Sequence, residues 1–148
     1  GPDRLLAAGL TRTAIVTGAS SGIGQACAVR LARAGWRVLA GVRREGDAPE
    51  GTEEVLLDVT DAEQIRGVAD RVDELNGLVN NAGIGVVGAF EATSMATVRE
   101  VFETNTFGVM AMTQAAVPMF RERRSGDRRA ARGPGRPGCS RRRHRAGW

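Results

Sequence analysis

The sequence of 148 residues contains no tyrosine and no lysine, so the Lys and Arg total of 21 consists of arginines alone. Any catalytic motif that needs a phenol or a side-chain amine is therefore excluded within this chain. Two cysteines are too few for a disulfide framework, and the single histidine has no neighbour that suggests a metal site. No apolar run approaches the ~20 residues of a membrane-spanning helix, and no secretory signal is visible. We expect a cytoplasmic protein with no metal and no membrane segment.

The net charge of +4 hides two regions of opposite charge. Residues 1–120 carry a net charge of −5, whereas residues 121–148 carry a net charge of +9. From residue 125 onward there is no Val, Ile, Leu, Met or Phe. Such a segment cannot offset the entropy of ordering its backbone by apolar burial. We expect one folded domain over residues 1–124 and a disordered arginine- and glycine-rich tail over residues 125–148.

The first 124 residues alternate short apolar runs with longer amphipathic segments. Their order is β-α-β-β-α-β-α, and the strands are apolar almost throughout, which predicts a parallel sheet covered on both faces. We therefore predict an α/β fold with a doubly wound parallel sheet. The predicted strands are 13–16, 37–42, 55–57 and 77–81, and the predicted helices are 21–34, 62–72 and 94–124.

Spacing and composition also predict local details of these helices. Ile23, Cys27 and Leu31 recur every four residues, which predicts that this stripe of the first helix faces the sheet. The last helix is expected to be interrupted near residues 104–108, and Pro118 could bend it. The predicted helix caps are Ser20 or Ser21, Thr60 and Ser94.

A glycine-rich turn joins the first predicted strand to the first helix. Residues 17–24 read Thr-Gly-Ala-Ser-Ser-Gly-Ile-Gly. Gly18 permits a tight turn, Gly22 removes a side chain where a phosphate approaches the backbone, and Gly24 permits close packing of the helix on the sheet. The free N–H groups and the positive dipole end of the helix would then face an anion. An ordinary tight β–α turn is the alternative.

Two arginines, Arg43 and Arg44, directly follow the second predicted strand. In dinucleotide-binding folds, an acidic residue at the end of this strand binds the ribose hydroxyls and favours NAD. Here two guanidinium groups suit the 2′-phosphate of NADP instead. We therefore predict NADP as the cofactor, with NAD as the alternative for the site and a solvated arginine pair as the alternative for these residues.

The glycine loop and three later motifs resemble the short-chain dehydrogenase/reductase family. The later motifs are Asp58 with Val59, the run Asn-Asn-Ala-Gly at residues 80–83, and Asn105. The resemblance implies a Rossmann-like fold and hydride transfer between a nicotinamide and a carbonyl or alcohol carbon. It implies that Asp58 accepts a hydrogen bond from the adenine amino group, with a simple turn cap as the alternative. The residues it implies for cofactor binding are Thr17, Gly18, Ser20, Ser21, Gly22, Ile23, Gly24, Arg43, Arg44, Asp58, Val59, Asn81, Ala82 and Gly83.

The family resemblance also gives a catalytic role to Asn105. In this family an asparagine at that point of the long helix holds a water in a proton relay to the active-site lysine. Family catalysis further uses a tyrosine as general acid/base, a lysine four residues later and a serine on the preceding strand. This chain has neither tyrosine nor lysine. We therefore expect it to be inactive as it stands.

The resemblance ends near residue 125, where a family member would begin its fifth strand. We accordingly expect a sheet truncated after about four strands, with an apolar edge that promotes oligomers or aggregates. A frameshift near codon 126 is our hypothesis for the basic tail, and a natural truncated form is the alternative.

Three functions follow from this sequence. The first is part of an NADP-dependent oxidoreductase that acts on an unknown small-molecule substrate. The second is a noncatalytic NADP-binding module. The third is nonspecific nucleic-acid binding by the arginine-rich tail, which would depend strongly on salt.

Overall fold

The computed structural model describes residues 11–130, with side chains placed as far as Arg121. One four-stranded sheet has the strand order β3-β2-β1-β4, and every pairing is parallel. This arrangement confirms the predicted α/β class and its Rossmann-like parallel sheet. The strands are β1 (Thr13–Thr17), β2 (Arg37–Val42), β3 (Glu53–Leu56) and β4 (Gly77–Val79).

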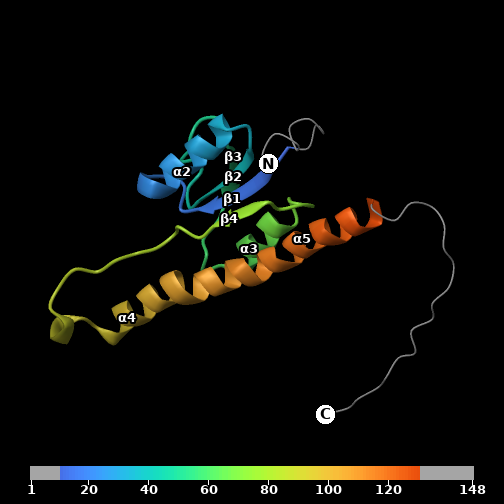
Figure 1. Ribbon diagram of the computed structural model, residues 1–148. Helices are drawn as coiled ribbons and strands as arrows, with labels where there is room; N and C mark the ends of the chain where they lie inside the picture. Colours follow the sequence, from blue (N-terminus) through green and yellow to red (C-terminus); the bar gives the residue numbers. More distant parts are fainter. Residues whose placement is uncertain (1–10, 131–148) are drawn as a thin grey trace, which may run out of the picture.

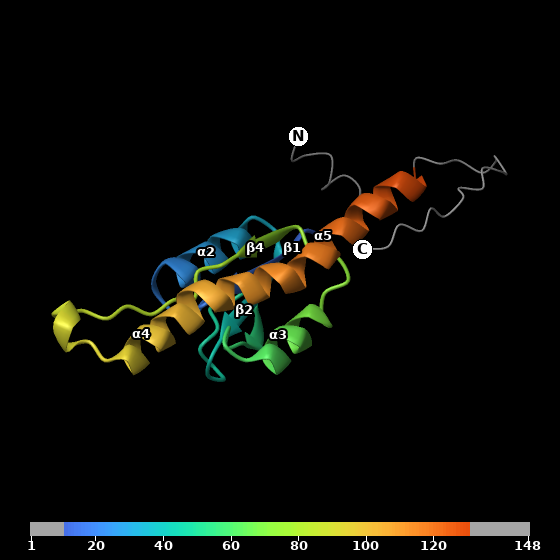
Figure 2. The same ribbon diagram turned by 90° about the horizontal axis from the view of Figure 1, so that it is seen from below.

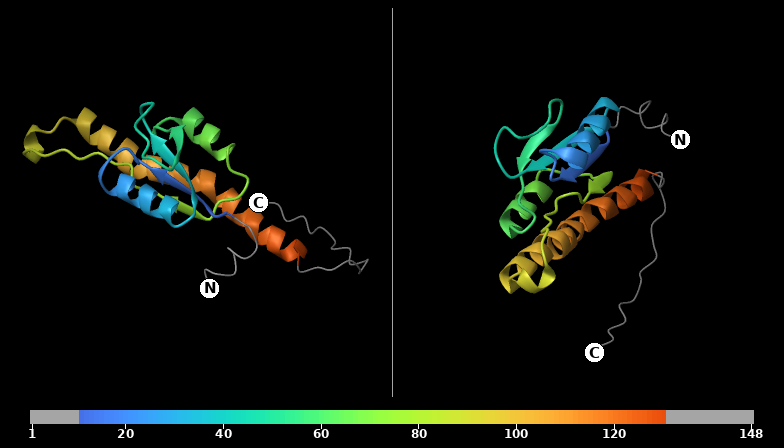
Figure 3. Two further views of the ribbon diagram at one scale, coloured as in Figure 1. Left: turned by 90° about the horizontal axis from the view of Figure 1, so that it is seen from above. Right: turned by 90° about the vertical axis from the view of Figure 1, so that its left-hand side faces the viewer.

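Helices cover both faces of the sheet (Figure 1). Helix α2 (Gly22–Arg33) lies on one face. Helix α3 (Ala62–Ala69) and the long helix that ends the described chain lie on the other face, as the right-hand view of Figure 3 also shows. Two apolar cores result, one on each side of the sheet, because successive side chains of a strand point to opposite faces.

The long helix consists of α4 (Met95–Phe102), the π-helical stretch η2 (Glu103–Gly108) and α5 (Val109–Ala130). Figure 2 shows these pieces in line as one rod. A short 3₁₀ turn, η1 (Phe90–Ala92), precedes it. The predicted interruption near residues 104–108 is therefore present as a π-helical stretch, a feature that often marks functional sites.

The long helix continues past its predicted end at residue 124, and α5 extends to Ala130. Residues 125–130 include Ser, Gly and Asp, which are poor helix formers, so the sequence gives no signal for this extension. Residues 125–130 are helical, contrary to the expected disorder. The rest of the predicted tail, residues 131–148, lies outside the described residues. No helix in the described part of the chain is both long and apolar enough to span a bilayer.

The sheet-facing side of α2 differs from the predicted stripe. Gly24 and Ala28 are buried, and Leu31 packs partly buried against the same core. Ile23, by contrast, is 82% exposed, and Cys27 is only half-buried. The helix begins so close to the sheet that small residues, not long apolar ones, occupy the contact. Periodicity of apolar side chains cannot reveal such a contact.

The helix caps agree with the prediction at one position of three. Ser94 caps α4 by accepting a hydrogen bond from the N–H of Thr97 at 3.1 Å. Helix α3 is capped by Asp61, not by Thr60; its carboxylate accepts two N–H groups of the first turn at 2.9 and 3.2 Å. Ser21 precedes α2, but its side chain accepts no hydrogen bond from the helix.

Candidate functional site

The carboxyl ends of the strands open into a cavity of about 540 Å³. Its walls come from the loop after β1, the ends of β2 and β3, the loop after β4 and the region where α4 meets η2. Ligands of open parallel sheets bind at this edge. Most of the predicted cofactor residues line the cavity: Gly18, Ser20, Ser21, Ile23, Arg43, Asp58, Val59, Asn81, Ala82 and Gly83. The predicted residues outside the lining are Thr17, Gly22, Gly24, Arg44 and Asn105.

Thr17 and Asn81 tie the ends of β1 and β4 together. The hydroxyl of Thr17, which is 1% exposed, accepts hydrogen bonds from the N–H groups of Asn81 and Ala82 at 3.0 and 2.9 Å. The side-chain amide of Asn81 donates to the carbonyl oxygens of Thr17 and Gly18, both at 3.0 Å. Thr17 is therefore buried beneath the residues that line the cavity, whereas Asn81 is itself one of the lining residues.

The glycines of the loop have two distinct roles. Gly18 adopts a φ of +65°, and a Cβ there would lie 2.8 Å from Cα of Ala82. A Cβ on Gly24 would overlap the carbonyl oxygen of Gly18 and the amide of Asn81. Gly22 has a φ of +57° but open space where a Cβ would stand. Thus Gly18 and Gly24 permit close packing within the protein, whereas Gly22 leaves room beside the helix start.

The first turn of α2 is left open by the protein itself. Ser21 has an extended backbone (φ −157°, ψ 171°), its side chain caps no N–H group, and the first turn holds no acidic residue. The first N–H groups of a helix have no partners within the helix, and they carry the positive end of its dipole. Because Ser20, Ser21 and Ile23 line the cavity, this open helix start faces a space that an anion can enter.

Asp58 lies at the other side of the cavity, after β3. Its Oδ1 accepts hydrogen bonds from the N–H of Thr60 at 2.9 Å and from the hydroxyl of Thr60 at 2.7 Å. These bonds, with a smaller contribution from the charge of Arg43, hold the pKa of Asp58 below its usual value, although partial burial opposes them. Asp58 is therefore a carboxylate at neutral pH. It caps its own turn and also presents a charged group to the cavity.

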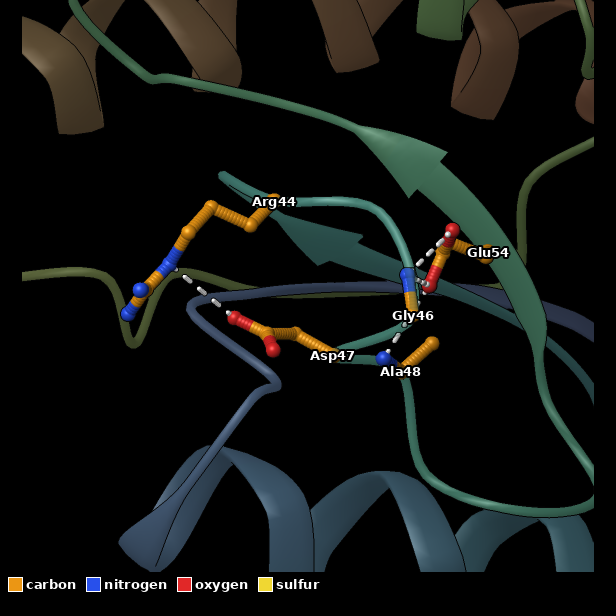
Figure 4. Close-up of polar contacts among 5 residues, drawn as sticks. All are labelled: Arg44, Gly46, Asp47, Ala48 and Glu54. Atoms are coloured by element: carbon orange, nitrogen blue, oxygen red, sulfur yellow. Dashed lines mark hydrogen bonds and ion pairs between the residues drawn. The ribbon is translucent and has the colours of Figure 1, made fainter.

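The two adjacent arginines point to different places. Arg43 lines the cavity. The Nε of Arg44 lies 3.5 Å from a carboxylate oxygen of Asp47, and its side chain is 86% exposed. Figure 4 shows Arg44 beside Asp47 on the loop that follows β2. Only one of the two predicted guanidinium groups is thus placed on the cavity wall.

Asn105, in the π-helical stretch, is engaged by the loop after β4. Its Nδ2 donates to the carbonyl oxygen of Ile84 at 2.7 Å, and its Oδ1 accepts from the N–H of Ile84 at 2.8 Å. A Cβ on Gly83 would lie 3.2 Å from that Oδ1. In this arrangement Asn105 fastens the cavity loop to the long helix.

Sequence reasoning missed several lining residues. Gly41 and Leu57 line the cavity, and a Cβ on Gly41 would lie 2.8 Å from Cδ2 of Leu57. Glu100, Glu103 and Thr104 approach from the long helix. No sequence signal indicates which turn of a long helix passes the cavity. Among the residues with described side chains, no group of three or more His, Cys, Asp and Glu could hold a metal ion.

Comparison with known proteins identifies the family. The model of the short chain dehydrogenase family matches residues 12–127. The chain belongs to the short-chain dehydrogenase family. Both the resemblance predicted from the motifs and the Rossmann-like fold are therefore confirmed.

Individual members of the short-chain dehydrogenase family match over most of this chain. It is 36% identical to retinol dehydrogenase 8 of Bos taurus over 131 residues, which cover 78% of this chain and 42% of that protein. It is 40% identical over 129 residues to an uncharacterized oxidoreductase of Myxococcus xanthus, with coverage of 78% and 51%. A crystal structure of a short-chain dehydrogenase from Streptomyces avermitilis matches with a TM-score of 0.71 at 40% identity, covering 76% and 46%. The chain thus spans about half the length of these relatives.

Proposed function

We propose that this chain binds NADP in the cavity at the carboxyl edge of its sheet, as the nucleotide-binding part of a short-chain oxidoreductase. One observation carries the proposal: a single cavity brings together an open helix start, Arg43 and Asp58. Family membership supports a nicotinamide dinucleotide as the ligand.

The residues present fit this ligand in three respects. The open start of α2 can donate N–H groups to a pyrophosphate, with no side chain at Gly22 in the way. Asp58 is ionised and can accept a hydrogen bond from an adenine amino group. Arg43 offers a planar set of donors that suits a 2′-phosphate. The volume of about 540 Å³ also lies within the usual range of ligand pockets.

A bound dinucleotide supplies hydride transfer between its nicotinamide and a carbonyl or alcohol carbon. The residues of this chain bind and orient it. Asn105 fastens the loop at residues 82–84 to the long helix through the backbone of Ile84. The chain contains no tyrosine phenol or lysine amine to exchange a proton with a substrate. We therefore propose that this chain by itself binds NADP without turnover.

The direct test titrates the protein with NADP⁺ and NAD⁺ by calorimetry. We expect saturable binding with NADP⁺ preferred. Arg43→Ala should lower the NADP⁺ affinity about tenfold or more, because a charge-assisted hydrogen bond to phosphate is lost. NAD⁺ affinity should change little. Arg44→Ala removes the same charge one residue away, outside the cavity lining, and should cost less than Arg43→Ala.

Two outcomes would contradict the proposal. If neither NADP⁺ nor NAD⁺ bound, the proposed nucleotide site would be excluded. Equal losses for Arg43→Ala and Arg44→Ala would show that only the overall positive charge matters.

Other functional predictions stay untested. A noncatalytic NADP-binding module makes the same binding prediction, and a folded monomer that NADP saturates would support it. Nucleic-acid binding by the basic segment concerns side chains beyond Arg121, which lie outside those described. The expected cytoplasmic location and self-association remain predictions as well.

A further inference from the structure

We propose that Glu54 is a positioning residue for NADP selectivity, acting through the loop that carries Arg43. This inference rests on the proposed binding of NADP. Glu54 lies on β3, outside the lining of the nucleotide cavity. It contacts the loop at residues 43–48, which leaves the end of β2 and turns back toward β3.

The carboxylate of Glu54 closes this loop. Its Oε2 accepts hydrogen bonds from the N–H groups of Gly46 at 2.9 Å and Ala48 at 3.1 Å, and its Oε1 lies 3.1 Å from the same N–H of Gly46 (Figure 4). Gly46 has a φ of +82°, so the chain reverses sharply there. Hydrogen bonds from N–H groups to a carboxylate are about twice as strong as neutral ones. Glu54 therefore fixes the turn at two of its backbone amides.

The strand register explains why Glu54, and not its neighbour, reaches the loop. Glu54 pairs with Ala40, whose side chain lies in the core on the α2 side of the sheet. Ala48 packs partly buried against that same core. Glu53 pairs with Leu39, which lies in the core on the opposite side. Adjacent residues of a strand point to opposite faces, so only Glu54 faces the loop.

Glu53 therefore provides a matched control. Its carboxylate is bound by Arg37, with Nε at 2.9 Å and Nη2 at 2.8 Å from Oε2. It lies on the same strand, carries the same charge and is half-buried like Glu54. Removing either carboxylate changes the net charge of the protein equally. The comparison therefore separates the loss of the hydrogen bonds to the loop from the loss of one negative charge.

The fixed loop matters for one ligand more than for the other. The backbone on the N-terminal side of Arg43 belongs to β2, and the backbone on its C-terminal side leads into the turn that Glu54 binds. Without Glu54 the turn would have to become ordered each time Arg43 contacts a 2′-phosphate. That ordering reduces the observed binding free energy. NAD has no 2′-phosphate, so its binding does not use this contact. Loss of Glu54 should therefore weaken NADP binding selectively.

The test compares Glu54→Ala with Glu53→Ala in titrations with NADP⁺ and NAD⁺. We expect Glu54→Ala to weaken NADP⁺ binding about tenfold, as one residue's worth of backbone ordering would, and NAD⁺ binding less than twofold. Glu53→Ala should leave the ratio of the two affinities unchanged. Hydrogen exchange at the amides of Gly46 and Ala48 should accelerate in Glu54→Ala and not in Glu53→Ala.

Each other result is decisive. An unchanged affinity ratio in Glu54→Ala, with the wild type still preferring NADP⁺, overturns the role of Glu54 and leaves the proposed function intact. Equal losses for both nucleotides show a general structural role and also overturn it. A wild type that binds neither nucleotide overturns the proposed function itself. If Glu54→Ala does not fold, Glu54→Gln, which keeps one oxygen at the loop, should show the same selective loss in smaller degree; an unchanged ratio there overturns the proposal.

Discussion

Helices α2 and α3 both start at the carboxyl edge of the sheet, but they begin in opposite ways. Helix α3 is closed by its own chain: Asp61 accepts two N–H groups, and Glu63 adds a negative charge in the first turn. Helix α2 has neither device, although Ser21 stands at the position of a cap. A side-chain cap contributes about 1 kcal/mol to stability. The difference agrees with the proposal that the α2 start binds a ligand, whereas the cap of α3 stabilises the fold.

The largest expected effect concerns Gly24, which lies where α2 contacts the sheet. Gly24→Ala places a Cβ onto the carbonyl oxygen of Gly18 and the amide of Asn81. We expect a loss of about 2–3 kcal/mol in the free energy of unfolding, because backbone in a packed turn cannot shift cheaply. Urea denaturation measures it.

The control for this substitution lies on α3. Gly67 is within the helix, and a Cβ there meets nothing within 4 Å. Gly67→Ala should stabilise the protein by about 0.5–1 kcal/mol, since alanine is the better helix former. If Gly24→Ala did not lower the free energy of unfolding, the described close contact between α2 and the sheet would be contradicted.

The caps give the next largest effect. Asp61→Ala removes both hydrogen bonds at the start of α3 and should cost about 1 kcal/mol of stability. Ser21→Ala removes no cap hydrogen bond and should change the unfolding free energy by less than about 0.5 kcal/mol. Thermal or urea unfolding of both variants checks this. Similar losses in the two would mean that both helix starts are closed alike.

The smallest effect concerns Asp58, which lies between β3 and α3. Its folded-state pKa is below the ordinary aspartate value, so the ionised carboxylate stabilises the fold at neutral pH. That contribution is fully present above the ordinary pKa and is lost as the pH falls through the lowered one. Asp58→Asn should therefore be less stable than the wild type at pH 7, and the gap should narrow below about pH 4. Urea unfolding from pH 7 to pH 3 measures the gap, and a constant gap would contradict the assignment.

Much of this site could be predicted from the sequence, because its signals are local. A glycine loop between a β-branched strand and a helix, and two asparagines after a later strand, are each informative without tertiary contacts. Most of the residues predicted from them line one cavity. Parallel strands bring their carboxyl ends to one edge, so residues far apart in sequence meet there.

The remaining features depend on contacts that no local pattern contains. Thr60 and Asp61 are both good caps, and Asp61 caps α3 while Thr60 bonds to Asp58. Nothing in the sequence distinguishes Arg43 from Arg44, but in the structure Arg43 lines the cavity and Arg44 lies beside Asp47. The contact between Glu54 and the loop cannot be predicted from the sequence, because it depends on the register of β3.

The most direct test of the open α2 start is to close it in the manner of α3. Ser21→Asp introduces the carboxylate cap that Asp61 provides for α3, next to the positive end of the helix. We predict an unfolding free energy that is equal or higher, by up to about 1 kcal/mol, together with at least a tenfold loss of NADP⁺ affinity, because the carboxylate would occupy the place of the phosphate. Undiminished NADP⁺ binding by this stable variant would contradict the claim that the α2 start holds the ligand.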